Sequence, residues 1–154
     1  MAEAKVPLII ENKVLGYQVQ FFLEDYELDK IKYKFEEADV KETYYQKDKI
    51  LFMASAKNQN GQFIADGTIR LTVTRDKVHD IQNQSIKIPD TLWQTTLDLS
   101  SKSATPILIP WKIMPKADIE LDIQAEFYNS SGEYQTKYES INVFNLSRYL
   151  EIKL

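Results

Sequence analysis

The 154-residue chain contains no cysteine, a single histidine and only four glycines. Without cysteine it forms no disulfide, zinc ribbon or iron–sulfur cluster and carries no thiol nucleophile. The single imidazole, His79, rules out a multi-histidine metal site, and the four separated glycines leave no glycine-rich loop to cradle a phosphate. Pairs among the 23 acidic residues leave glycosidase chemistry open, yet no cleft-forming pattern singles any pair out. We predict no catalytic, cofactor-binding or metal-binding residues, and a protein that is not an enzyme and needs no cofactor.

The charge balance and the lack of long apolar runs argue against two further classes of partner. Nineteen Lys and Arg residues against 23 Asp and Glu residues give a net charge of −4, whereas nucleic-acid binders usually carry a basic surplus. The apolar run Val6–Ile10 is far shorter than the roughly 20 residues that span a bilayer, and no signal-peptide cleavage pattern follows it. We expect neither nucleic acid as a partner nor a membrane-spanning segment.

What the sequence does contain is strict alternation of apolar and polar residues. Between residues 119 and 127 every odd position is apolar and every even position is polar, which predicts a strand with one dry and one wet face. The turn cluster Asn129–Gly132 and a second alternating run follow, so we predict a β-hairpin with Tyr134, Thr136 and Tyr138 pointing inward. The apolar positions then shift to Ile141 and Val143, which predicts a bulge or a strand end near residue 140.

Similar patterns predict further strands. Ile50–Lys57 and Thr68–Thr74 flank the turn Asn58–Gly61 and read as a second hairpin. Ile31–Phe35 and residues 93–99 alternate as well, and Thr105–Trp111 contains Pro106 and Pro110, which suits an edge strand. The predicted interior is built from eight apolar side chains: Ile50, Phe52, Ile69, Leu71, Val73, Leu121, Ile123 and Phe127.

The strand spacing predicts an all-β fold, an antiparallel immunoglobulin-like β-sandwich of about seven strands, with a barrel as the alternative. We place the sandwich at residues 30–144. Residues 1–29 carry N-terminal strand patterns, and residues 145–154 carry a C-terminal one. These end strands belong to a preceding and a following domain, pair with each other, or enlarge the sandwich.

Two groups of residues contain the atoms of a reactive or metal-binding site but have a simpler interpretation. His79, Asp80 and Ser85 contain the atoms of a hydrolytic triad, but the polar stretch Arg75–Asp80 predicts a solvated loop and a surface histidine. The acidic face of residues 118–126 offers oxygen ligands for calcium. A flat strand spreads such carboxylates about 6.6 Å apart, so we predict a solvated face with Lys137 as a cross-strand partner.

The segment around Trp111 is the only candidate site that we retain. Trp111, Ile113 and Met114 follow the proline-bounded run in a loop-like setting. They either fill the core or form a contact surface for a neighbouring domain, because aromatic and methionine side chains are enriched in interface cores.

Four segments resemble the macroglobulin-type domains of the alpha-2-macroglobulin family, in particular its bacterial branch. Tyr44–Ile50 is similar to the aromatic, aspartate and β-branched opening of such a domain, and Ala54–Gly61 to its first hairpin. Gly67–Arg75 is similar to its next strand, and Asp122–Gln135 to its closing hairpin. The resemblance spans about residues 31–143 and implies a macroglobulin-type β-sandwich.

Proteins of this family are large protease traps, built from successive β-sandwich domains around a cleavable bait region and often a thioester. The thioester requires a cysteine, so the resemblance implies a non-catalytic scaffold module rather than the reactive centre. Its partners would be neighbouring domains of a larger polypeptide, and proteases through the full-length protein, in a protease-inhibition or host-defence role. The implied location is the periplasm or the cell surface.

One alternative stays open from the sequence: an immunoglobulin-like binding module of a surface adhesin or a carbohydrate-binding protein. It predicts an exposed aromatic strip, for which Tyr44, Tyr45, Trp93 and Trp111 are the candidates. A small hydrolase is the third and weakest hypothesis.

Overall fold

The computed structural model describes residues 30–46, 48–81 and 85–145. The strand patterns predicted within residues 1–29 and after Asn145 lie outside the described residues. The following account concerns the compact unit that begins at Ile31.

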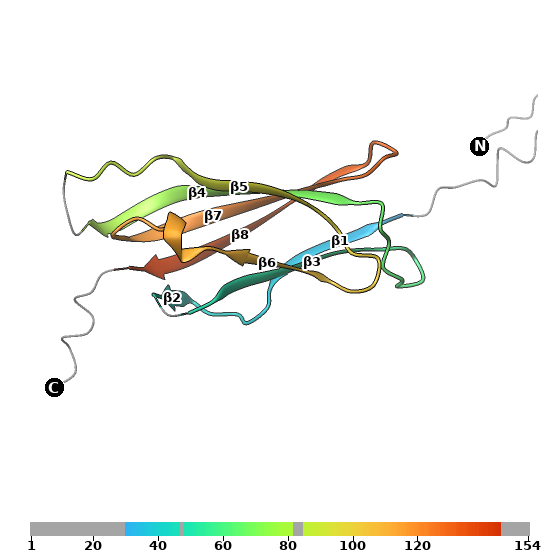
Figure 1. The fold of residues 1–154 in the computed structure, drawn as a ribbon, viewed down its shortest axis with the longest axis horizontal. Helices are drawn as coiled ribbons and strands as arrows, with labels where there is room; N and C mark the ends of the chain where they lie inside the picture. Colours follow the sequence, from blue (N-terminus) through green and yellow to red (C-terminus); the bar gives the residue numbers. More distant parts are fainter. Residues whose placement is uncertain (1–29, 47, 82–84, 146–154) are drawn as a thin grey trace, which may run out of the picture. The chain divides into compact units, whose positions relative to one another are not determined.

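Eight strands form two packed sheets, which confirms the predicted β-sandwich (Figure 1). The three-stranded sheet has the order β1 (Lys32–Glu37), β3 (Ile50–Lys57) and β6 (Thr105–Ile109). The five-stranded sheet has the order β2 (Thr43–Tyr45), β8 (Tyr134–Phe144), β7 (Ala117–Tyr128), β4 (Thr68–Ile81) and β5 (Thr91–Asp98). Among the described residues the only helical element is a short 3₁₀ turn, Trp111–Ile113, so none of them forms a helix suited to crossing a membrane.

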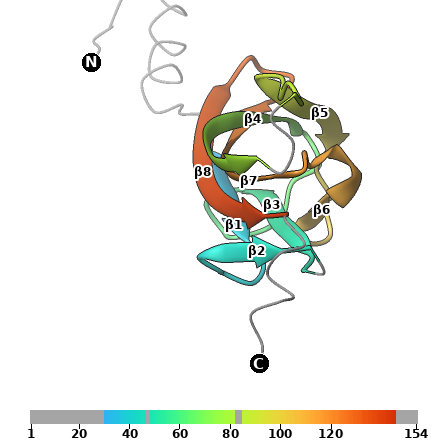
Figure 2. The same ribbon diagram turned by 90° about the vertical axis from the view of Figure 1, so that its left-hand side faces the viewer.

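Apart from the short β2, the strands β1, β3 and β6 form one sheet and β4, β7 and β8 the other, as strands A, B, E and C, F, G do in the immunoglobulin fold. β5 joins the second sheet beside β4. The chain leaves β1 in the three-stranded sheet and crosses to β2, which pairs in parallel with the end of β8. All other strand pairs are antiparallel. Viewed along the sandwich, β1 and β8 lie on one side and β5 and β6 on the other (Figure 2).

The core lies between the two sheets and contains the residues that the sequence predicts for it. All eight predicted interior side chains are fully buried. The rings of Phe35 and Phe52 stack at 4.7 Å within the three-stranded sheet, and those of Tyr33 and Phe127 stack at 4.9 Å between the two sheets. The edge assignment is also confirmed, because β6 pairs only with β3.

Two predicted features of the middle of the chain are wrong. β3 and β4 do not form a hairpin; they lie in different sheets, because residues 58–67 carry the chain across the sandwich. The polar stretch Arg75–Asp80 is not a loop but part of β4, which pairs with β7 as far as Ile81. Register shifts at Arg75/Lys77 and Val78/Asp80 accommodate extra residues in β4, and they disturb the alternation from which the strand would be recognised.

The predicted orientation of β8 is also wrong, and there is no bulge near residue 140. β8 pairs with β7 in one unbroken register, in which Ile141 lies opposite Leu121 and Glu139 opposite Ile123. Directly opposed residues share a face, so the odd positions of β8 point inward throughout. Tyr134 and Tyr138 therefore point outward and are 59% and 68% exposed.

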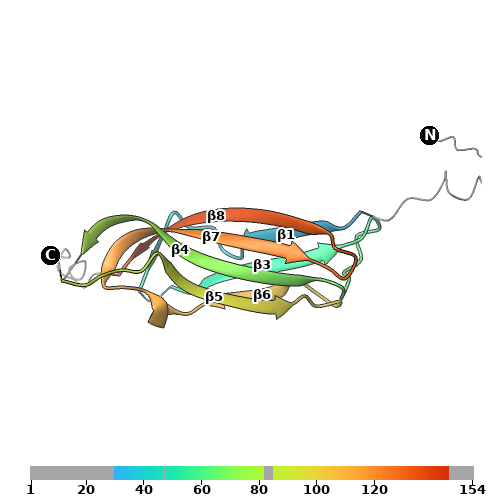
Figure 3. The same cartoon turned by 90° about the horizontal axis from the view of Figure 1, so that it is seen from above.

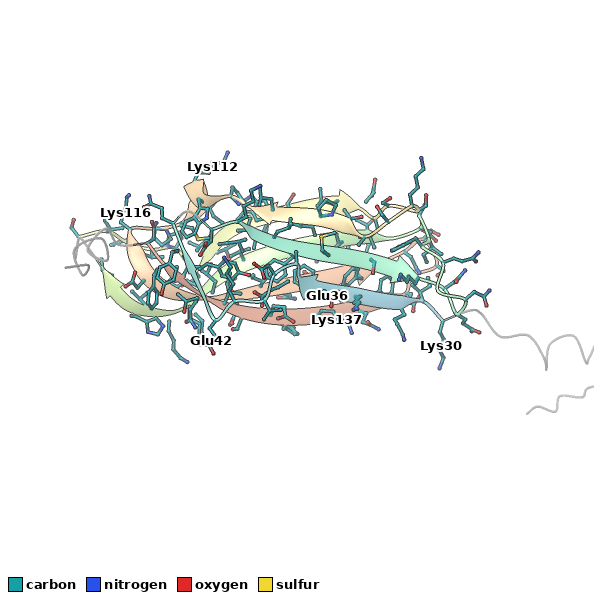
Figure 4. The ribbon with its side chains drawn as sticks, turned by 90° about the horizontal axis from the view of Figure 1, so that it is seen from below. Lys30, Glu36, Glu42, Lys112, Lys116 and Lys137 are labelled. Carbon is teal, nitrogen blue, oxygen red and sulfur yellow. The ribbon has the colours of Figure 1, made fainter. Side chains whose placement is uncertain are left out.

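The inward odd positions in the first part of β8 are Gln135, Lys137 and Glu139, and all three are half-buried. The side of the sandwich where β8 comes close to β1 is therefore lined by polar groups, and Figure 4 shows Lys137 on this side with Glu36 of β1. Inward-pointing charges on an edge strand discourage pairing with another sheet edge. Burial and the charge of Glu37 raise the pKa of Glu139.

The first strand, β1, begins at one end of the sandwich, and the last strand, β8, finishes at the opposite end (Figure 3). β1 begins at the end that carries the β7–β8 turn, where Asn129 donates a hydrogen bond to the hydroxyl of Tyr33 at 3.1 Å. β8 ends beside β2 and Asp118, at the opposite end. Figure 4 marks the first end by Lys30 and the second by Lys112 and Lys116. We call these the entry end and the exit end.

Candidate functional site

At the exit end the structure joins Trp111 to two segments that are distant in sequence. The indole N–H of Trp111 donates to the carbonyl oxygen of Asp48 at 2.5 Å, and the carboxylate of Asp48 accepts from the backbone N–H of Tyr45 at 2.8 Å. The ring of Tyr45 meets that of Phe144 edge-on at 5.8 Å. Tyr45, Asp48, Trp111 and Phe144 thus form one surface, next to the point where the chain leaves β8. We call it the exit-end surface.

The three residues predicted for a domain interface differ in their exposure. Met114 is only 8% exposed and belongs to the core. Trp111 and Ile113 are partly buried and pack against the same core. Met114 therefore fills the core, and contact of Trp111 and Ile113 with a neighbouring domain stays a prediction.

The turn that supports the exit-end surface is held by charged groups. The backbone N–H of Tyr45 and the ammonium group of Lys41, whose Nζ lies 3.1 Å from Oδ1, lower the pKa of Asp48. The buried Tyr44 donates its hydroxyl to Glu37 at 2.5 Å, and burial together with this bond raises the pKa of Tyr44. This bond ties the start of the turn to β1.

The outer face of the five-stranded sheet carries a second ordered surface. Three successive rungs run across β5, β4, β7 and β8, and strand register assigns their members to one face. The rungs are Asp98–Thr68–Tyr128–Tyr134, Thr96–Arg70–Glu126–Thr136 and Gln94–Thr72–Gln124–Tyr138. We call this surface the tyrosine face.

A carboxylate in the middle of the tyrosine face fixes one of its rings. Glu126 is only 8% exposed and binds Arg70 through two hydrogen bonds, of 2.8 and 3.1 Å. The hydroxyl of Tyr134 donates to the same carboxylate at 2.6 Å. The hydrogen bonds from Arg70 and, to a smaller extent, from Tyr134 lower the pKa of Glu126. The carboxylate therefore stays ionised at neutral pH and keeps its hydrogen bonds to both side chains.

The four aromatic residues predicted for a binding strip do not form one. Tyr44 is buried, Trp93 lies on the inner side of β5 and is partly buried, and Trp111 is partly buried at the exit end. Only Tyr45 is substantially exposed, at 49%. The exposed pair is instead Tyr134 and Tyr138, for which the sequence pattern predicts an interior position. The odd positions of Ile141 and Val143, read back along an unbroken strand, would have revealed it.

The remaining candidates are the triad-like residues and the acidic row on β7. His79 is exposed on β4, and Ser85 lies beyond residues 82–84, which the structure does not describe. The acidic row on β7 is neutralised mainly from β4, by Arg70 at Glu126 and by Lys77 at Glu120, the latter at 3.4 Å. Lys137, the predicted partner, points to the other face because it lies opposite Ala125. Within the described part of the chain, no three acidic, histidine or cysteine side chains are grouped to hold a metal ion.

No protein-family model and no curated protein matches the chain. The resemblance to macroglobulin-type domains therefore depends on the segments themselves, whose places in the fold are now defined. Tyr44–Ile50 spans β2, the Asp48 turn and the start of β3, and Asp122–Gln135 spans the β7–β8 hairpin.

Proposed function

We propose that the chain is a non-catalytic structural module of an alpha-2-macroglobulin-like protease-trapping protein. The module would hold neighbouring domains in place and would meet proteases only through the full-length polypeptide. The proposed location is the periplasm or the cell surface. The proposal assigns no cofactor and no catalytic residue to this chain.

The observation that carries the proposal is the separation of the entry and exit ends. Domain termini often lie close together, an arrangement that suits insertion into another domain. Here β1 begins at one end of the sandwich and β8 finishes at the other, so flanking domains would attach at opposite ends. A module of this kind passes the chain along a row of domains.

The segments that carry the family resemblance support a structural role, because their polar residues hold turns. Asp48 binds the backbone N–H of Tyr45, and Asn58 accepts from the backbone N–H groups of Asn60 and Gln62 at 2.9 and 3.0 Å. Asn129 accepts from Ser131 and Glu133 in the β7–β8 turn. Ser130 in that turn donates its hydroxyl to Asp66 at 2.6 Å, which fastens the two loops of the entry end together.

The exit-end surface gives the module a means of contact. Phe144 of the Tyr45–Phe144 ring pair directly precedes Asn145, the last described residue of the chain, and Trp111 is joined to the same turn through Asp48. A domain that follows directly would meet these side chains first. Aromatic side chains of this kind are enriched in interface cores.

Protease retention by the native polypeptide tests the proposal. The polypeptide is recovered from its source cells with an antibody against this chain, incubated with an active protease and separated by size. We expect the protease to co-elute with the polypeptide, and the same protease with a blocked active site to elute alone. A protease that remains free after cleaving the polypeptide would contradict the trapping role.

The non-catalytic assignment has its own test. The 154-residue chain is screened with ester and glycoside substrates, with a His79→Ala variant as the matched control. We expect no turnover above buffer for either protein. Turnover by the parent chain that the His79→Ala variant loses would contradict the assignment and restore the hydrolase hypothesis.

A further inference from the structure

The tyrosine face differs from an ordinary solvated sheet surface in composition. Its twelve positions hold three tyrosines, four threonines and two glutamines, together with Arg70, Glu126 and Asp98. None of these side chains is aliphatic. The fully buried core of a protein–protein interface is more apolar than other surfaces, and although tyrosine and arginine are enriched there, this face offers no aliphatic side chain to such a core.

The charges of the face are already engaged. Arg70 and Glu126 neutralise each other in a bidentate pair, and Asp98 at the edge accepts from the hydroxyl of Thr68 at 3.2 Å. No lysine lies on these rungs. With Arg70 engaged by Glu126 and no lysine on the rungs, the face is poorly matched to phosphate or sulfate groups. The remaining carboxylate, Asp98, lies at the edge, so the middle of the face suits a neutral ligand.

The tyrosines occupy regularly spaced positions on the face. Tyr138 follows Tyr134 by four positions, which places their Cα atoms about 13 Å apart along β8. Tyr128 lies opposite Tyr134 on the next strand. The bond from Tyr134 to the buried Glu126 limits the rotation of that ring before any ligand arrives, which lowers the entropy cost of binding.

We propose that the tyrosine face binds a neutral oligosaccharide. The apolar faces of the sugar rings stack on Tyr134 and Tyr138, which present an apolar body and a polar hydroxyl. The sugar hydroxyls exchange hydrogen bonds with the amides of Gln94 and Gln124 and the hydroxyls of Thr72 and Thr136, each of which both donates and accepts. This binding is independent of the role as a structural module, since the tyrosine face and the exit-end surface use different residues.

Titration of the isotopically labelled 154-residue chain, followed by NMR, tests the proposal. The probes are cellohexaose, xylohexaose, laminarihexaose, maltohexaose and chitohexaose, and a heparin hexasaccharide serves as the charged counter-probe. We expect saturable shifts from at least one neutral probe, centred on the Arg70 side chain and the backbone of β7 and β8. We expect none from heparin.

Variants locate the binding. Tyr138→Ala and Tyr134→Ala are each expected to weaken binding about two- to tenfold, in line with a lost aromatic contact. Tyr45→Ala removes a tyrosine of similar exposure at the exit end and is the matched control, expected to bind as the parent does. The absence of saturable shifts from all five neutral probes would overturn the proposal. Binding of heparin alone, or an equal loss in the Tyr45→Ala variant, would overturn it as well.

Discussion

Truncating Ile141 to alanine is expected to lower the free energy of unfolding by about 2–5 kcal/mol, whereas truncating Tyr138 is expected to lower it by less than about 1 kcal/mol. Ile141 is 3% exposed and packs opposite Leu121, so its truncation leaves a cavity in the core. Tyr138 is 68% exposed, so its truncation costs only the difference in strand propensity between tyrosine and alanine, which lies within about 1 kcal/mol. The comparison tests the register of β8, on which the tyrosine face depends.

The assay is urea unfolding of the full chain, followed by tryptophan fluorescence. Trp93 and Trp111 are both partly buried against the core and report its exposure. Where the free energy of unfolding falls with urea concentration at the same rate in the parent and the variants, differences in the urea midpoints convert directly into differences in that free energy. A larger loss for Tyr138→Ala than for Ile141→Ala would show that Tyr138 points inward, and it would refute both the register and the tyrosine face.

Three further predictions concern single positions. Glu139→Gln should stabilise the sandwich at neutral pH, because a raised pKa means that the folded state disfavours the charged form; the gain should vanish below the ordinary glutamate pKa of 4.5, where the parent side chain is protonated in both states. Urea midpoints at neutral and acidic pH measure this, and a gain that persists in acid would contradict the cause. Gly132→Ala should cost about 1 kcal/mol, because Gly132 has a φ of +86° and a side chain there is strained although it meets no neighbour; an unchanged melting temperature would contradict this. Trp111→Ala should cost about 1–2 kcal/mol for a lost hydrogen bond and partial burial. A loss above about 3 kcal/mol in this chain would instead show that Trp111 is mainly a core residue and would contradict its interface role.

The fold was predictable where one face of a strand is buried and the other is not. Residues 119–127 of β7 lie between two other strands and beneath the opposite sheet, so the core selects apolar side chains at every second position. The same reason makes the interior residues of β3 and β4 predictable. The two proline residues of the β6 segment indicated an edge strand, since proline supplies no N–H for a ladder.

Edge strands and sheet crossings carry weaker signals. The inner face of β8 is polar at Gln135, Lys137 and Glu139 because it borders the side of the sandwich, while its outer face carries tyrosines. Hydropathy alone therefore assigns the two faces the wrong way round. β2 has only three residues, and it forms because the end of β8 offers a free edge, which is a tertiary effect.

The candidate surfaces were predictable only in part. Trp111 was found from its residue type, but its partners Asp48, Tyr45 and Phe144 come from segments that only the fold brings together. The Arg70–Glu126–Tyr134 assembly joins three strands. Arg70 and Glu126 are 56 residues apart in the sequence, so no local sequence pattern predicts this assembly.

The size of the native polypeptide tests the central claim most directly. An antibody raised against this chain is used to blot fractions of the source cells. The account predicts a band many times larger than the 18.0 kDa of this chain, in the envelope or periplasmic fraction. A band near 18.0 kDa in the soluble cytosol would contradict a module of a protease trap and would leave a small free-standing binding protein in its place.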